Sequence, residues 1–215
     1  MALFLVGITL FCLVHLFPAL APASRENLVF KLGENPYKGI YSLLILGGLV
    51  MIVFGWKATT PAPLYVPPLG PGILPAVLVL VGLVLFFASN MKGYLRRTLR
   101  HPQMIGTLLW AGSHLLTNGD SRSVILFGSL SIWALLEIVL CNRRDGPRKE
   151  LPSASLKGDV IAVVIGVLLV GIRQLGAVVT RVADQVTVQV VLIRIMHCRA
   201  IVAKVVNQVS VRVFP

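Results

Sequence analysis

Long apolar runs separated by polar connections dominate the chain. The runs are rich in Leu, Ile, Val and Gly, carry few charges, and occupy residues 2–20, 40–56, 73–89, 123–141 and 158–171. A helix that crosses a bilayer needs on the order of 20 apolar residues, so each run predicts a transmembrane helix, the last of them short. The pattern is typical of a membrane bundle, because a soluble helix would show one apolar stripe and one polar face.

A more polar stretch lies at residues 100–120, between the third and fourth runs. Pro102 suits the first position of a helix, and Asn118-Gly119 suit its end, so we predict a further helix from Pro102 to Asn118. Polar groups in apolar surroundings are costly unless they are partnered, so its polar side chains should face other helices or a cavity. This helix is the candidate site, and its members of interest are Gln103, Thr107, Trp110, Ser113, His114, Thr117 and Asn118.

Two connections have distinct characters. Residues 21–39 are polar, so we expect a polar connection in which Pro22, Pro36 and Gly39 act as breakers. Residues 59–72 hold five prolines and two glycines, which predicts an extended segment.

The composition excludes several classes of protein. The 215 residues are 56% hydrophobic and 13% charged, which indicates an integral membrane protein. The net charge of +12 does not indicate nucleic-acid binding, because the basic residues punctuate apolar runs instead of forming one basic face. The partner in contact with most of the surface is therefore the lipid bilayer. Cys12, Cys141 and Cys198 are too widely spaced to suggest a zinc site or a disulfide framework.

The distribution of Lys and Arg predicts the orientation. The five connections carry 3, 1, 4, 1 and 5 of these residues in chain order. Because cytoplasmic loops are enriched in Lys and Arg, the odd connections should be cytoplasmic and the amino terminus outside. A cleaved signal peptide is the alternative for residues 2–20, but no Lys or Arg precedes Arg25. We predict an all-α polytopic membrane bundle of about six transmembrane helices.

The carboxyl-terminal segment breaks this pattern. Residues 172–215 are Val-rich, with two-residue alternation at 186–190 and 209–213 that is typical of a strand. A lone strand beside a helical bundle has no pairing partner. We therefore separate a transmembrane domain, residues 1–171, from an irregular tail, residues 172–215, that is either loosely ordered or the product of a reading-frame disturbance.

Several short motifs are dispersed over residues 1–170. They are Val14-His15-Leu16-Phe17-Pro18-Ala19, Leu32-Gly33-Glu34, Tyr37-Lys38-Gly39-Ile40-Tyr41-Ser42, Gly55-Trp56, Pro67-Pro68, Arg100-His101-Pro102, Trp110-Ala111, His114-Leu115-Leu116-Thr117-Asn118-Gly119-Asp120 and Leu126-Phe127-Gly128. Together, and in this order, they resemble the NnrU family of bacterial membrane proteins. The resemblance implies a place in the bacterial inner membrane and an accessory role in nitrogen-oxide (denitrification) metabolism, with other membrane proteins of nitrogen-oxide respiration as partners.

The NnrU family is similar in fold to plant ζ-carotene isomerase, a membrane protein that holds haem b. This second resemblance implies that His15 and His101 are candidate ligands of a haem iron, and it gives the alternative of a haem-dependent isomerase or redox enzyme that acts on a lipid-soluble substrate. No histidine lies between His114 and His197, so a later histidine of the isomerase is missing here. Single ligation by His15, single ligation by His101, and no cofactor at all remain open.

A third resemblance is to membrane methyltransferases. It rests on Arg100-His101-Pro102 and Gly106, but those enzymes hold S-adenosylmethionine with several acids and aromatic residues near their carboxyl end, and the tail here has one acid, Asp184, and one aromatic residue, Phe214. A structural bundle whose polar groups bond only one another is the remaining alternative.

The predicted topology places the candidate residues at two levels. His15, Arg100, His101 and the one acid in the apolar runs before residue 142, Glu137, should lie together on the cytoplasmic side. His114 lies 13 positions after His101, or about 20 Å along a helix, and therefore belongs to the outer half.

Overall fold

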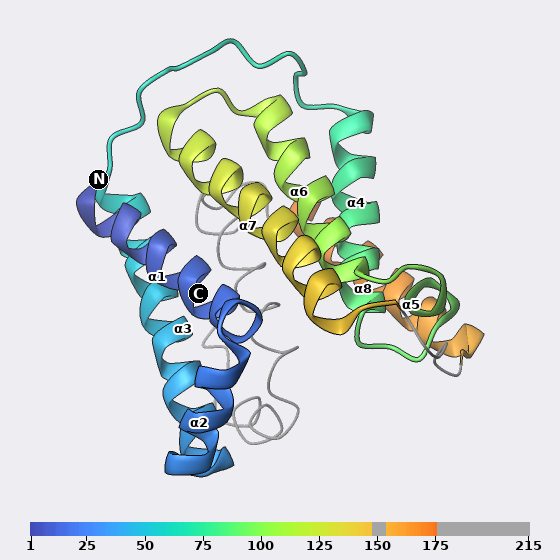
Figure 1. Ribbon diagram of the computed structural model, residues 1–215. Helices are drawn as coiled ribbons and strands as arrows, with labels where there is room; N and C mark the ends of the chain where they lie inside the picture. Colours follow the sequence, from blue (N-terminus) through green and yellow to red (C-terminus); the bar gives the residue numbers. More distant parts are fainter. Residues whose placement is uncertain (148–153, 176–215) are drawn as a thin grey trace, which may run out of the picture. The chain divides into compact units, whose positions relative to one another are not determined.

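The computed structural model describes residues 1–147 and 154–175, and all of the regular secondary structure in this part of the chain is helical. Figure 1 shows its eight helices. They are α1 (Ala2–Leu20), α2 (Pro22–Leu32), α3 (Glu34–Ala58), α4 (Ile73–Ala88), α5 (Tyr94–Thr98), α6 (Pro102–Thr117), α7 (Ser121–Asp145) and α8 (Leu156–Leu175). The all-α prediction is confirmed for the described residues.

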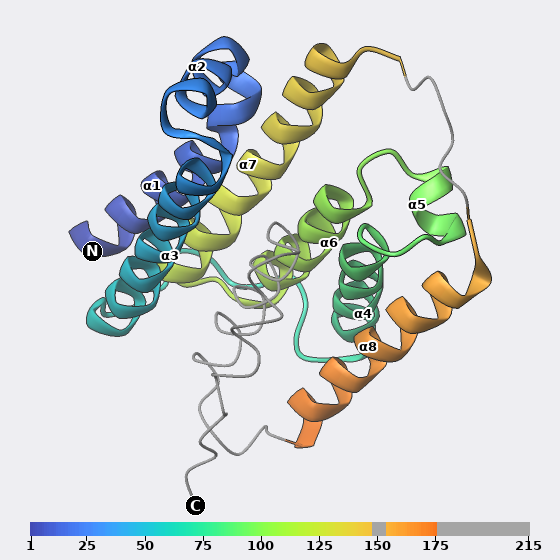
Figure 2. The same cartoon turned by 90° about the horizontal axis from the view of Figure 1, so that it is seen from below.

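The long helices pack in an order that differs from their order in the chain. α1 packs against both α3 and α7, α7 also packs against α6, and α4 packs against both α6 and α8. The neighbours therefore run α3, α1, α7, α6, α4, α8, an order that can be followed in Figure 2. As a result, α1 and α6 pack against different sides of α7.

Glycines set the closest of these helix contacts. A Cβ atom on Gly55 of α3 would lie 2.5 Å from the backbone of Phe4 in α1. A Cβ atom on Gly82 of α4 would lie 2.8 Å from the carbonyl oxygen of Gly106 in α6. Backbones can approach this closely only where a side chain is missing, as at helix contacts in membranes.

Three of the described helices, α1, α3 and α7, are long and apolar enough to cross a membrane, and α4 is a shorter apolar helix. Their outward side chains are apolar as well: Leu13, Leu43, Phe54 and Ile132 are 56 to 68% exposed. Large exposed apolar surfaces of this kind are costly in water. The helices therefore indicate a membrane protein.

The polar connection at residues 21–39 is helical, since it forms α2 and the start of α3, and the prediction that Pro22, Pro36 and Gly39 act as breakers is wrong. Pro22 occupies the first turn of α2 and Pro36 the first turn of α3, where a missing N–H is harmless. The chain instead breaks at Gly33, whose φ of +84° favours glycine.

The remaining boundaries follow the sequence more closely. The extended segment at 59–72 and the helix from Pro102 are confirmed. The last helix is longer than predicted, because α8 runs from Leu156 to Leu175. The predicted tail is residues 172–215. Its first residues, 172–175, belong to α8, so its predicted start is wrong, and the rest lies outside the described residues and stays a prediction.

Candidate functional site

The candidate helix α6 is built as its sequence predicts. Pro102 lies in its first turn, and its last carbonyl groups are bonded by the side chain of Asn118, whose Nδ2 donates to the carbonyl oxygen of His114 at 2.9 Å. Helix ends leave carbonyl groups without intrahelical partners, so this bond closes the helix. The prediction of a helix that ends near Asn118 is confirmed.

His114 is enclosed in the contact between α6 and α7. Its side chain is 2% exposed, and its ring stacks on Phe127 with 4.4 Å between ring centroids. Trp110 meets the edges of both rings at centroid distances of 5.0 Å. Two motif residues, Trp110 and His114, thus pack α6 against α7.

The turn between α6 and α7 binds the extended segment 59–72, which crosses over it at one end of the helices (Figure 1). The amide of Leu64 donates to the carbonyl oxygen of Gly119 at 2.8 Å, and the amide of Leu69 donates to that of Leu116 at 3.0 Å. The hydroxyl of Tyr65 donates to the carbonyl oxygens of Asn118, at 2.9 Å, and of Leu115. We call these bonds between residues 59–72 and 115–121 the linker latch.

Asp120 and Arg122 extend the linker latch to α3. The carboxylate of Asp120 accepts from the amides of Arg122 and Ser123 and so caps the start of α7. The guanidinium group of Arg122 donates to the carbonyl oxygens of Trp56, at 3.1 Å, and Thr59, at 3.0 Å, and lies over the Trp56 ring at 4.8 Å. One arginine at the start of α7 thereby fixes the end of α3.

His15 lies where α1 meets α7 and α3. It is 4% exposed, and its Nδ1 lies 2.8 Å from the carbonyl oxygen of Phe11. Because a carbonyl oxygen only accepts, this nitrogen donates. The ring meets Trp133 of α7 at 5.3 Å and Tyr41 of α3 at 6.3 Å between centroids.

His101 directly precedes α6 and contacts α7 near its carboxyl end. Its Nε2 is 2.8 Å from Oδ1 of Asn142, near the carboxyl end of α7, while the preceding Arg100 is partly buried. Between these two histidine contacts along α7 lies Glu137, whose Oε1 accepts from the thiol of Cys141 at 3.7 Å.

The contacts of α7 separate the two histidines that the isomerase resemblance offers as iron ligands. His15 meets Trp133 and His101 bonds Asn142, positions that are nine residues, or about 13 Å, apart along the helix. The Nε2 atom of His101 is also already engaged by Asn142. These residues do not fit a haem held by both histidines, because two axial ligands must reach one iron from opposite faces. His114, between Trp110 and Phe127, belongs to yet another level.

Residues 1–147 and 154–175 contain no cluster of three or more His, Cys, Asp or Glu side chains that could hold a metal ion.

Comparison with known protein families supports the resemblance that the sequence motifs indicate. The sequence model of the NnrU protein family matches residues 3–202. The chain belongs to the NnrU family. No curated protein and no solved structure matches it. The region of NnrU likeness also includes residues 172–202 of the segment that the sequence analysis separates as a tail.

In this NnrU protein, sequence reasoning missed several residues that position the site. Arg122 and Tyr65 hold the linker latch, and Trp133 packs on His15. A signal for Arg122 was available, since this arginine, two residues after the Asp120 cap, is the one basic residue of its connection. The partners of Tyr65 and Trp133 lie far away in the chain, so local pattern could not reveal them.

Proposed function

We propose that this NnrU-family chain is a six-span protein of the bacterial inner membrane that serves nitrogen-oxide metabolism as a non-catalytic accessory component. The observation that carries the proposal is that side chains of the family motifs take part in contacts within the helical bundle. Trp110 and His114 join α6 to α7, Asn118 closes the end of α6, and His101 bonds α7. Side chains consumed in helix contacts support a scaffold that holds other membrane proteins of nitrogen-oxide respiration, because a catalytic role would need them to reach a substrate.

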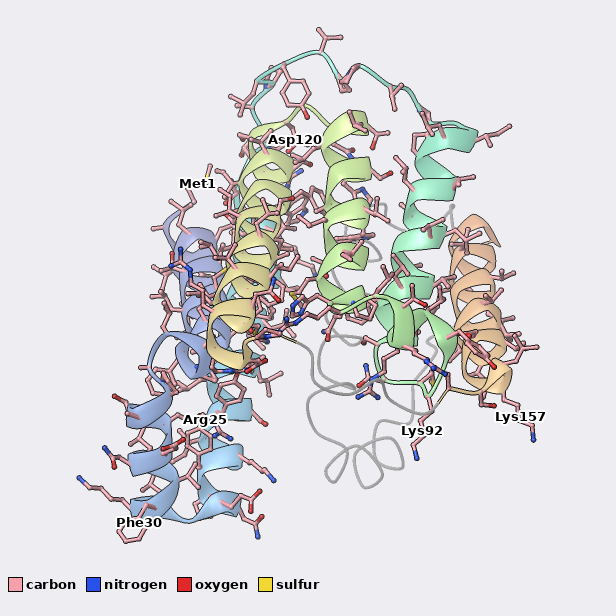
Figure 3. The ribbon with its side chains drawn as sticks, turned by 45° about the vertical axis from the view of Figure 1, so that its right-hand side comes forward. Met1, Arg25, Phe30, Lys92, Asp120 and Lys157 are labelled. Atoms are coloured by element: carbon pink, nitrogen blue, oxygen red, sulfur yellow. The ribbon has the colours of Figure 1, made fainter. Side chains whose placement is uncertain are left out.

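The charge distribution supports the orientation in this proposal. Figure 3 shows Arg25, Lys92 and Lys157 at one end of the helices and Met1 and Asp120 at the other. Because Lys and Arg accumulate on the cytoplasmic side, the end with Lys92 is cytoplasmic and the amino terminus is outside.

Cysteine labelling tests this orientation in intact cells. Leu64→Cys and Lys157→Cys, each in a chain whose native cysteines are replaced by Ala, place one thiol at each end. A membrane-impermeant maleimide should label Leu64→Cys in intact cells and Lys157→Cys only after lysis. Labelling in the reverse order would overturn the orientation, and labelling of both in intact cells would overturn the odd number of spans between them.

Complementation tests the accessory role. A strain that lacks the gene and is defective in nitrogen-oxide respiration should be restored by the native chain and by His101→Gln, since glutamine can still bond Asn142. His101→Leu should restore it less well, in step with a lower melting temperature. A loss of function in His101→Gln without loss of stability would refute the scaffold role.

A haem-dependent enzyme acting on a lipid-soluble substrate is the second candidate, and one observation favours it. His15 is buried among aromatic rings and donates its Nδ1 hydrogen to a backbone carbonyl group, the arrangement that orients many metal-ligating histidines. His15 would hold haem b there, and the haem would supply redox chemistry. A Soret band in the purified protein that disappears in His15→Ala would replace the accessory proposal with this one, and a colourless protein would support the first. No contact among the described residues favours the methyltransferase alternative.

A further inference from the structure

Three polar atoms near the cytoplasmic half of α6 and α7 are enclosed by protein but have no hydrogen-bond partner among the described residues. They are Nε1 of Trp133, Nε2 of Gln103 and Oε2 of Glu137. An enclosed polar group without a partner lowers the free energy of unfolding by about 1–3 kcal/mol, so three such groups in one region are unusual in a stable bundle. Trp133 is only 3% exposed, so exposure to lipid does not explain why its Nε1 has no partner.

The helical repeat places Glu137 between the side of α7 that faces α1 and the side that faces α6. On α7, Trp133 faces α1, where it contacts His15, and Phe127 faces α6, where it contacts Trp110. At 3.6 residues per turn, Glu137 lies about 40° from Trp133 and about 80° from Phe127 around the axis. Its carboxyl group therefore occupies the angle between the two neighbouring helices.

The same geometry brings Gln103 to this groove. Gln103 precedes Trp110 by seven residues and lies about 20° from it around α6, on the face that meets α7. α6 and α7 are antiparallel, and Trp110 lies against Phe127, so Gln103 is level with the turn of α7 that holds Trp133 and Glu137.

We propose that Gln103, Trp133 and Glu137 form a binding site for the hydroxyl group of a neutral, lipid-soluble molecule. The amide and indole nitrogens donate, and the carboxyl oxygen accepts, so the three atoms match a hydroxyl group, which does both. A charged ligand is excluded by its cost at this depth, and the rings of Phe11 and His15 beside Trp133 supply an apolar, aromatic wall. The site is independent of the accessory role proposed above.

A pair of matched probes tests this site in the full-length, detergent-purified chain. 4-Hexylphenol carries the hydroxyl group, and 4-hexylanisole has a methyl ether in its place, which accepts a hydrogen bond but cannot donate one to Glu137. We expect hexylphenol to raise the melting temperature saturably, and hexylanisole to need about a ten-fold higher concentration for the same rise, because one hydrogen bond is lost. Thermal unfolding followed by circular dichroism measures both.

Substitutions localise the effect. Glu137→Leu should abolish the difference between the two probes, whereas Glu137→Gln, whose amide oxygen still accepts, should keep it and serves if the Leu variant does not fold. Trp56→Phe is the matched control. Trp56 is 4% exposed and so nearly as buried as Trp133, and its Nε1 also has no partner in the described part of the chain, but it lies at the opposite end of the bundle. Its loss should leave the preference unchanged.

Several results would overturn the proposal. Equal shifts by the two probes would mean that they act through the detergent or the outer surface. No shift by either would mean that water satisfies the three atoms. A preference that survives in Glu137→Leu, or that disappears in Trp56→Phe, would place the binding elsewhere.

Discussion

Arg122→Ala is expected to release the end of α3 from the start of α7. The guanidinium group donates to the carbonyl oxygens of Trp56 and Thr59 and covers the Trp56 ring, and its side chain is 16% exposed. A hydrogen bond from a charged donor contributes about 1.5–3 kcal/mol and a cation–π contact about 0.5–1 kcal/mol, while water at the bundle end recovers part of the loss. We therefore expect the free energy of unfolding to fall by about 2–4 kcal/mol.

Two measurements check this expectation. Unfolding in mixed micelles of rising SDS content, followed by circular dichroism, gives the change in stability, and chymotrypsin digestion reports on Tyr65, which should be cut faster once the linker latch loosens. Arg122→Lys keeps the charge but not the two-pronged geometry, so it should lose about half as much.

The control is Lys57→Ala, which removes an exposed cation one residue from Trp56. It should change stability by less than about 0.5 kcal/mol, as exposed substitutions usually do. The assigned role of Arg122 is refuted if Arg122→Ala behaves like Lys57→Ala, or if Arg122→Lys is as stable as the native chain.

Two glycine substitutions probe backbone contacts. Gly106→Ala should lower the melting temperature by several degrees, because its Cβ atom would collide with the carbonyl oxygen of Gly82, whereas Gly112→Ala in the same helix, which has nothing within 4 Å, should be neutral or stabilising. Gly119→Ala would place its Cβ atom against the carbonyl oxygen of Tyr65, so we expect faster chymotrypsin cleavage there at an almost unchanged helix content; equal cleavage rates would contradict it.

Local signals predicted the helices where they were sufficient by themselves. Pro102 and Asn118 delimited α6 correctly, because a proline at the start and a polar residue at the end act within one turn. The same reasoning failed at Pro22 and Pro36, which stop a helix only when several residues precede them in it. The actual break required the positive φ of Gly33, which one glycine among many does not announce.

The candidate site was less predictable, because its contacts depend on the order in which helices pack. The predicted topology places His15 and His101 together on the cytoplasmic side. In the structure α7 lies beside both α1 and α6, and the two histidines contact it at different levels, His15 at Trp133 and His101 at Asn142. Sequence spacing gives the depth of a residue to within a turn or two but not which neighbour it faces. The proposed site of Gln103, Trp133 and Glu137 likewise depends on that order, because it relies on α6 lying beside α7.

The linker latch has a consequence for how the chain is made. Residues 59–72 leave the ribosome well before residues 115–121, so the amides of Leu64 and Leu69 have only water as a partner until α6 and α7 have been inserted. Synthesis therefore passes through a stage in which α1 and α3 are in place but their connection to α4 is still open. The linker latch therefore forms only at the end of insertion, when it joins the helices translated first to those translated later. A chain whose synthesis stops before Gly119 would leave residues 59–72 exposed to proteases.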